Sequence, residues 1–195
     1  MAPFTVITRV PIPAAIPPTK VIAALQTCEA LITPNPYLER FERRTVPPEE
    51  TANDTFFNPS NGGSSSLQGY TVYERIPIIP GVGQWATKQV VIPCIFQTIN
   101  PGVRCRGEAE GGVTVRSSYE VRWRGEVKDG PDLVVGPGEE GDYELLDISS
   151  IECGALVRPF VKMRFSSGHQ AILKQVIEDL QKADGAQPNN ATASQ

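Results

Sequence analysis

The sequence predicts an α+β domain in which a run of antiparallel strands forms a curved sheet around a long C-terminal helix. Three observations lead to this fold class. A β-branched N-terminal segment precedes an amphipathic helical pattern, the middle of the chain alternates between apolar and polar residues, and the last apolar pattern has helical spacing. The length of 195 residues suits one domain, and 40% hydrophobic with 21% charged residues is typical of a folded chain.

The N-terminal part of the chain predicts a strand followed by a helix. Residues 4–10 are rich in β-branched side chains, and this strand stops at Pro11. From Thr19 to Ile32, apolar residues recur at spacings of four, three and four, which places them on one face of a helix. The sequence TPNP at 33–36 ends this helix, and the segment that follows, 37–46, fits either a short helix or the start of a strand.

Residues 47–69 have the composition of a loop. They contain Pro-Pro, Asn-Asp and Asn-Pro pairs and a run of glycine and serine, which neither a helix nor a central strand favours. We expect a long mobile loop here, with Phe56 and Phe57 as its only apolar anchors.

The rest of the middle region predicts strands. Their expected ranges are 70–79, 84–99, 103–110, 113–127 and 142–149. The strand at 113–127 is the clearest, because its odd-numbered positions are mostly apolar and its even-numbered positions mostly charged. Gly111 and Gly112 predict a two-residue hairpin turn before it. Residues 128–141 are rich in glycine, proline and acids, and we expect a surface loop there.

The C-terminal part predicts the long helix. Ser167 and Gln170 have the spacing of a capping box, and apolar residues at helical spacing follow until Gly185. An upstream extension of this helix past Pro159 is an open alternative. We therefore expect one domain over residues 1–184 and a disordered tail over 185–195.

Composition excludes several classes of protein. A net charge of −4 and a pI of about 5.1 argue against a nucleic-acid binder. One histidine and four dispersed cysteines supply too few ligands for a metal site, and we expect the cysteines to be small buried side chains. Phosphate loops, dinucleotide fingerprints and nucleophile elbows are missing from the sequence, so we expect no cofactor. With no secretory signal and no membrane-spanning stretch, we expect a cytoplasmic protein.

The order of these elements resembles the START-like, polyketide-cyclase-type helix-grip (SRPBCC) superfamily, and within it a fungal family of unknown function. The resemblance lies in FTVIT at 4–8 with its proline-rich link, VIAAL at 21–25 with LITPNP at 31–36, and the stretch from Ile151 to His169. It covers residues 4–183. The resemblance supplies no catalytic signature, but it implies a deep and mostly apolar cavity between the sheet and the long helix.

Aromatic and hydroxyl side chains on the expected strands are candidates for the lining of such a cavity. Ser117, Tyr119 and Trp123 share the expected inner face of their strand, where they are either core residues or ligand contacts. The same two interpretations apply to three further residues, Tyr70, Tyr73 and Trp85.

His169 is the one candidate for acid or base chemistry, because no other side chain in this sequence has an unperturbed pKa near neutrality. Its place in the expected first turn of a helix predicts an exposed side chain, which favours a surface role over a catalytic one.

A charged face is predicted on strand 103–110, where arginine and glutamate alternate with small or apolar residues. We expect Arg104 and Arg106 to belong to a solvated lattice of cross-strand ion pairs. In the alternative, a bulge inverts the strand and points one arginine inward, where it holds a ligand carboxylate or enolate.

Three functions follow as hypotheses. The first is binding of a hydrophobic small molecule, such as a lipid, sterol or polyketide-type metabolite, in an internal cavity. The second is a cofactor-independent cyclase or isomerase of fungal secondary metabolism that acts in the same cavity. The third is a protein-interaction module that uses Phe56 and Phe57. The sequence leaves the oligomeric state open.

Overall fold

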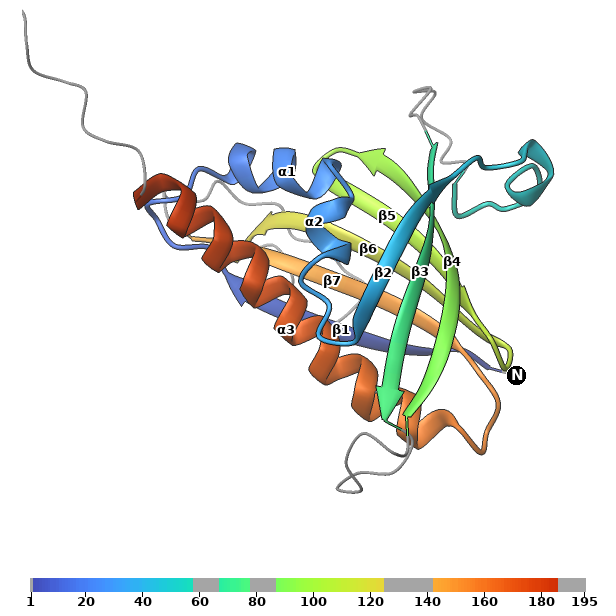
Figure 1. The fold of residues 1–195 in the computed structure, drawn as a ribbon. Helices are drawn as coiled ribbons and strands as arrows, with labels where there is room; N and C mark the ends of the chain where they lie inside the picture. Colours follow the sequence, from blue (N-terminus) through green and yellow to red (C-terminus); the bar gives the residue numbers. More distant parts are fainter. Residues whose placement is uncertain (1, 58–66, 78–86, 125–141, 186–195) are drawn as a thin grey trace, which may run out of the picture.

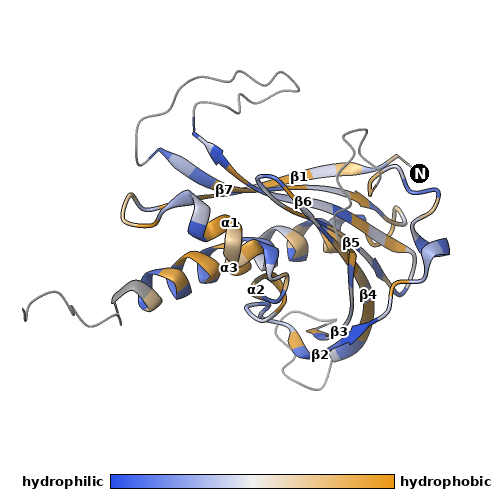
Figure 2. Cartoon of the chain, turned by 90° about the horizontal axis from the view of Figure 1, so that it is seen from above, coloured by the Kyte–Doolittle hydropathy of each residue, from blue (hydrophilic) through white to orange (hydrophobic). Residues whose placement is uncertain are grey.

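Helix α3 (Arg158–Gly185) lies in the hollow of a curved antiparallel sheet, as Figures 1 and 2 show. The structure is a computed structural model that describes residues 2–57, 67–77, 87–124 and 142–185. The described strands form one seven-stranded sheet in the order β1-β7-β6-β5-β4-β3-β2. Their bounds are β1 Phe4–Pro11, β2 Leu38–Arg44, β3 Leu67–Pro77, β4 Thr87–Ile99, β5 Gly102–Ala109, β6 Val113–Trp123 and β7 Tyr143–Glu152. The α+β fold class, with a curved sheet that grips a long C-terminal helix, is thus confirmed.

The N-terminal helical pattern is split into two helices, α1 (Pro18–Gln26) and α2 (Glu29–Ile32). The break occurs at Cys28, whose φ of 62° is in the left-handed region and cannot continue a helix. The Cys28 side chain remains fully buried, so the change of direction between α1 and α2 does not expose it to solvent. The prediction of one continuous helix over Thr19–Ile32 is therefore wrong. The segment left open at 37–46 contains strand β2.

The core fills the space between the concave face of the sheet and the second half of α3. On α3 the buried side chains are Ile172, Leu173, Val176 and Ile177. They belong to one cluster with Val21 and Leu25 of α1 and with the concave-face residues of the sheet, among them Tyr70, Val103, Tyr119, Val121 and Leu145. This packing fixes α3 along the sheet.

Helix α3 begins at Arg158, more than two turns before the expected start at Ser167. Pro159 does not prevent this, because a proline in the first turn of a helix lacks only an N–H that would have no partner there. Ser167 is not an N-cap: its Oγ donates to the carbonyl oxygens of Met163 and Arg164, at 3.2 and 3.1 Å. The expected capping box is therefore wrong, and the open alternative of a longer helix is correct.

The segment after β2 packs on the convex face of the sheet, the side away from α3. It contains the short helix η1 (Pro48–Glu50), and Phe57 is only 3% exposed. Gln97 and Arg104 hold it by donating to the carbonyl oxygens of Phe57 and Phe56, at 2.7 and 3.0 Å. Residues 47–57 form a loop with one short 3₁₀ turn, as expected, but the two phenylalanines are not its only anchors, because Gln97 and Arg104 also bind its backbone. The expected loop is wrong for residues 67–69, which belong to β3. Residues 58–66 lie outside the described part.

The turn between β5 and β6 contains the two glycines that the sequence indicated. Gly111 and Gly112 have φ values of 86° and 74°, which suit glycine better than other residues. The connection spans three residues, 110–112, one more than expected. The expected tail at 185–195 falls outside the described residues except for Gly185, the last residue of α3.

Within the described ranges, no helix is long and apolar enough to cross a membrane. The same ranges contain no group of three or more histidine, cysteine or acidic side chains that could hold a metal ion.

Candidate functional site

A buried pair of titratable side chains connects the middle of α3 to the middle of β7. Nδ1 of His169 lies 2.6 Å from Oδ2 of Asp147. The Asp147 side chain has no exposed surface, whereas that of His169 is 17% exposed. His169 therefore does not lie on the surface at a helix end, as the sequence predicted. Because α3 begins earlier, this residue falls inside the helix on the side that faces the sheet.

Two serines extend this pair across the sheet. Oγ of Ser149 donates to Oδ1 of Asp147 at 2.6 Å, and the hydroxyls of Ser149 and Ser117 lie 2.6 Å apart. Ser117 and Ser149 are opposite one another in the pairing of β6 with β7, which is why their side chains meet. Both carboxylate oxygens of Asp147 therefore have partners, as a fully buried carboxylate requires.

Aromatic rings enclose the imidazole of His169. The ring of Phe165 stacks on it with centroids 3.6 Å apart, and the ring of Tyr119 lies nearly parallel at 6.0 Å. The Tyr119 hydroxyl is 3.3 Å from Nδ1 of His169. Burial raises the pKa of Tyr119 well above its usual value, and the negative charge of Asp147 raises it further, so its hydroxyl keeps its proton.

A second acid, Glu74, lies on β3, on the same strand face as the core residues Tyr70 and Val72. Oε1 of Glu74 accepts a hydrogen bond from Nδ2 of Asn35 at 2.6 Å. Burial raises the pKa of Glu74, while the hydrogen bond from Asn35 and the charge of His169 act in the opposite direction. Asn35 is itself held by the backbone N–H of Tyr37, which donates to its Oδ1 at 2.9 Å.

Arg164 lies one and a half turns before His169 on α3. Its Nη1 donates to the hydroxyl of Tyr37 at 3.2 Å, and its guanidinium lies over the rings of Tyr37 and Phe160 at 6.0 and 5.6 Å. Gly168 brings the helix close to Tyr37, since a Cβ at this glycine would lie 3.7 Å from the tyrosine ring.

The concave face beside these polar groups is apolar and only half-buried. Gly107 identifies this face, because a Cβ there would lie 3.4 Å from Ile92 and 3.6 Å from the core residue Cys94. Val115 is opposite Gly107 and shares its face. Ile92 and Val115 are both half-buried, as are Val161 and Phe165 of α3. The first half of α3 therefore covers its part of the sheet less completely than the second half does.

The candidate lining residues fall into different environments. Ser117 and Tyr119 lie in the polar network around His169, and Tyr70 is fully buried in the core. Tyr73 is on the convex face, where its ring lies under the Arg40 guanidinium and its hydroxyl is 3.4 Å from Glu42, so it lies outside the concave site. Trp123 is half-buried near the end of β6. Trp85 lies outside the described residues.

The arginines of β5 point away from α3, so the inverted-strand alternative is wrong. Arg106 is only 9% exposed, because the segment after β2 covers it: its side chain pairs with Asp54 and donates to the carbonyl oxygen of Glu50 at 3.0 Å. The solvated lattice is also wrong for this residue. Ion pairs on the same face join other partners, such as Arg116 with Glu152 at 2.8 Å.

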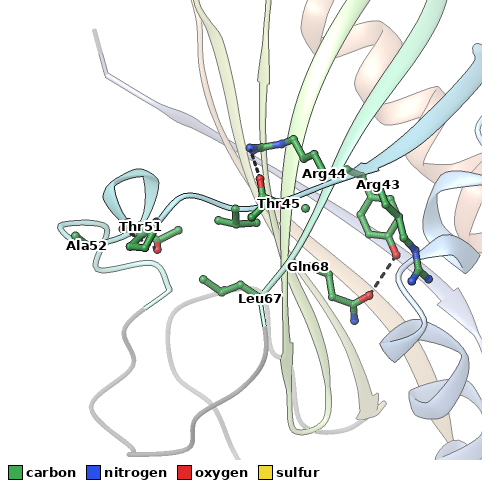
Figure 3. Close-up of a pocket in the computed structure, with 11 residues that line it drawn as sticks. Arg43, Arg44, Thr45, Thr51, Ala52, Leu67 and Gln68 are labelled. Carbon is green, nitrogen blue, oxygen red and sulfur yellow. Dashed lines mark hydrogen bonds between the residues drawn. The ribbon is translucent and has the colours of Figure 1, made fainter.

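A pocket of about 700 Å³ lies elsewhere, between the end of β2, η1 and the start of β3 (Figure 3). Its lining includes Arg43, Arg44, Thr51, Leu67 and Gln68, and does not include His169, Asp147 or Tyr119. Both arginines already have acidic partners, Arg43 with Glu29 and Arg44 with Glu50. We therefore do not place the functional site here.

Sequence reasoning missed Asp147, Ser149 and Glu74. A signal for the first two was present, because they share their strand face with Leu145 and Ile151, and polar residues among apolar ones on one face indicate a buried polar contact. The same signal marks Glu74, which shares its strand face with Tyr70, Val72 and Ile76.

Comparisons with known proteins give a family and a fold. A family model described as "Domain of unknown function (DUF7053)" matches residues 2–182. No curated protein matches the sequence. Among solved structures, TTHA0849 from Thermus thermophilus is similar with a TM-score of 0.54 and 14% sequence identity, over 93% of this chain and 98% of that chain. At this identity the similarity shows the fold alone.

Proposed function

Because the chain belongs to the DUF7053 family, whose function is unknown, we propose its function from its own residues: it binds an apolar small molecule of the lipid, sterol or polyketide type on the concave face of the sheet, under the first half of α3. The START-like resemblance of the sequence supports this proposal by analogy, since that fold encloses apolar ligands.

The observation that carries the proposal is the difference between the two halves of α3. In the second half, the apolar side chains that face the sheet are almost fully buried, with Leu173 at 0% and Val176 at 3% exposure. In the first half, Val161 and Phe165 are only half-buried, as are Ile92 and Val115 on the facing strands. A ligand bound there would remove this apolar surface from water, which is the main driving force for such binding.

The experiment measures the affinity for Nile red, an uncharged dye whose fluorescence rises in apolar surroundings. Val115→Arg places a charge on the concave face and should weaken dye binding at least tenfold. Arg116→Ala, at the next position on the opposite face, is the matched control and should stay within threefold of the unmodified protein. Circular dichroism verifies that both variants fold. Equal affinities for the two variants would contradict the proposal.

A second candidate function is a cofactor-independent cyclase or isomerase in the same place. The Asp147–His169 pair favours it, because a carboxylate that holds Nδ1 of an imidazole orients the ring and leaves Nε2 for proton transfer. His169→Gln should then lower turnover of a polyketide substrate by ~10²–10⁴ with a much smaller change in affinity. Unchanged product formation would leave binding as the function.

Two further expectations belong to this proposal. We place the protein in the cytoplasm, supported by its four free cysteines, which suit a reducing compartment. The third hypothesis, a protein-interaction module, is disfavoured by the position of Phe57, which is buried on the convex face and cannot act as an exposed anchor.

A further inference from the structure

We propose that two copies of this chain associate edge to edge through strand β2, so that their sheets join across a two-fold axis at Phe41. This inference goes beyond the proposed function and does not depend on it, because it concerns an edge of the sheet and not its concave face. It starts from an open outer edge on β2 and from the order of the charges along this strand.

Strand β2 is one of the two edge strands of the sheet (Figure 1). It pairs with β3, and in the described part of the chain no backbone hydrogen bond joins residues 39–44 to any other segment. Every second residue of an edge strand directs its N–H and C=O groups away from the sheet, where another strand can bind them. The edge is accessible, since the side chains of Arg40, Glu42 and Arg43 are 51%, 57% and 70% exposed.

The side chains of β2 alternate between the two faces of the sheet. Phe41 is opposite Val72, a core residue of the concave face, so Arg40 and Glu42 point to the convex face. A bulge lies between Leu38 and Arg40, where the register with β3 shifts. Regular pairing with a second strand therefore involves residues 40–44.

The charge sequence of β2 selects one register for this pairing. When two copies of a strand pair antiparallel around a two-fold axis, the residue at the axis lies opposite its own copy. A charged residue at the axis would face a like charge, which destabilises a cross-strand pair. Between Arg40 and Arg44, Phe41 is the one uncharged residue, so it is the one position of this segment that suits the axis.

With Phe41 at the axis, opposite charges face one another on both sides of it. Arg40 is opposite Glu42 of the second copy, and Glu42 is opposite Arg40 of the second copy. These two side chains already form an ion pair within one strand, so the four together alternate in sign and no existing pair has to break. The half-buried ring of Phe41, whose centroid is 6.0 Å from that of Tyr70, meets its copy and loses further contact with water.

Charged side chains on an edge strand commonly prevent association, because two such edges bring like charges together. On β2 the signs of Arg40 and Glu42 are opposite about Phe41, so the same charges exclude other registers and favour this one. The contact uses the same edge of both copies and therefore closes at two chains. We expect a dimer of defined register at this edge.

Sedimentation velocity over concentrations from micromolar to millimolar measures this association. The unmodified protein should shift from monomer to dimer as its concentration rises. Arg40→Glu and Glu42→Arg should each weaken the association at least tenfold, because like charges then face one another across the axis. The double variant Arg40→Glu with Glu42→Arg restores opposite charges and should associate within threefold of the unmodified protein. Circular dichroism verifies that all three variants fold.

A mixture of the two single variants is the sharper measurement. In Arg40→Glu both positions are acidic, and in Glu42→Arg both are basic, so each strand repels its own copy but matches the other. The equimolar mixture should form a heterodimer, whereas each variant alone should remain largely monomeric. A loss of association caused only by misfolding would not be rescued in this way.

Cysteine cross-linking tests the register. Residues directly opposite in an antiparallel pair have Cα atoms about 4.5–5.5 Å apart, within the range that a disulfide spans. Under mild oxidation, Phe41→Cys should form a disulfide-linked dimer. Arg43→Cys, two positions away on the same face, is the matched control, because its two copies would lie four strand positions or about 13 Å apart. The unmodified protein controls for the four native free cysteines.

Three results would overturn the proposal. A chain that stays monomeric at every concentration has no such interface, and its charged edge then protects the sheet or binds a strand of another protein. A dimer that survives both single charge reversals is built from another surface. Cross-linking through Arg43→Cys and not through Phe41→Cys excludes the axis at Phe41. None of these results bears on Nile red binding, so the proposed function stands or fails separately.

Discussion

Nδ1 of His169 and Oδ2 of Asp147 are 2.6 Å apart, and this contact ties the middle of α3 to a strand in the sheet that it crosses. The carboxylate is fully buried and depends on His169 and Ser149 for its hydrogen bonds. The pair therefore acts on stability as well as on any chemistry of the site.

Removal of one partner should cost more than removal of both. His169→Ala leaves the carboxylate of Asp147 buried without its main partner, and we expect a loss of about 3 kcal/mol in the free energy of unfolding. The double variant His169→Leu with Asp147→Leu should be more stable than His169→Ala, because no buried charge remains. Urea unfolding measures both. A double variant that is less stable than His169→Ala would contradict this account.

Arg106 should hold the segment 47–57 on the convex face. Arg106→Ala removes its contacts to Asp54 and Glu50, and we expect faster proteolytic cleavage in this segment and a loss of about 2 kcal/mol in stability. Arg116→Ala, opposite it on β6, removes a more exposed ion pair and should change stability by less than about 1 kcal/mol. Similar cleavage of the two variants would show that Arg106 does not hold the segment.

The same segment should loosen in acid. For Asp54, burial would raise the pKa, but the hydrogen bond from the Phe56 N–H and the contact with Arg106 outweigh it, so the folded-state pKa is lowered. A carboxyl with a lowered pKa in the folded state contributes stability above its unfolded pKa of about 3.9, and that stability is lost as the pH falls through the folded value. Asp54→Asn should remove this part of the pH dependence of the melting temperature. If the melting temperature of this variant falls at acid pH as much as that of the unmodified protein, the pairing of Asp54 with Arg106 is contradicted.

Gly102 should not tolerate a side chain. A Cβ there would collide with the backbone carbonyl of Tyr119, so Gly102→Ala forces the β5–β6 pairing to shift. We expect a loss of more than about 2 kcal/mol, within the range of large effects of strained backbone substitutions. Gly154→Ala is the control, since its Cβ would meet nothing closer than 3.9 Å. Equal melting temperatures of the two variants would contradict this packing.

Ser167→Ala tests where α3 begins. Because Ser167 lies inside the helix and its hydroxyl bonds back to the preceding turn, alanine at this position should leave stability unchanged or raise it by a few tenths of a kcal/mol. Thermal unfolding measures the change. A loss of about 1 kcal/mol would instead indicate the N-cap that the sequence predicted.

The candidate site was only partly predictable. Ser117 and Tyr119 could be placed on the concave face because a strand alternates its side chains, and their neighbours made the inner face apolar. The same logic put Tyr73 in the wrong group, because Tyr70 and Tyr73 are three positions apart and must lie on opposite faces. The sequence identified His169 as a candidate but predicted an exposed position in the first turn of a helix, whereas the residue lies inside α3 and contacts Asp147.

The sequence by itself determined the order of the elements and the fold class, because the apolar period is a local property that each strand or helix carries alone. Only the tertiary structure decided which distant side chains contact one another. His169 lies 22 residues from Asp147 in the sequence, and Arg106 lies 52 residues from Asp54. Such contacts depend on the curvature of the sheet, the start of α3 and the path of the segment after β2, and these follow from packing among distant parts of the chain rather than from local patterns.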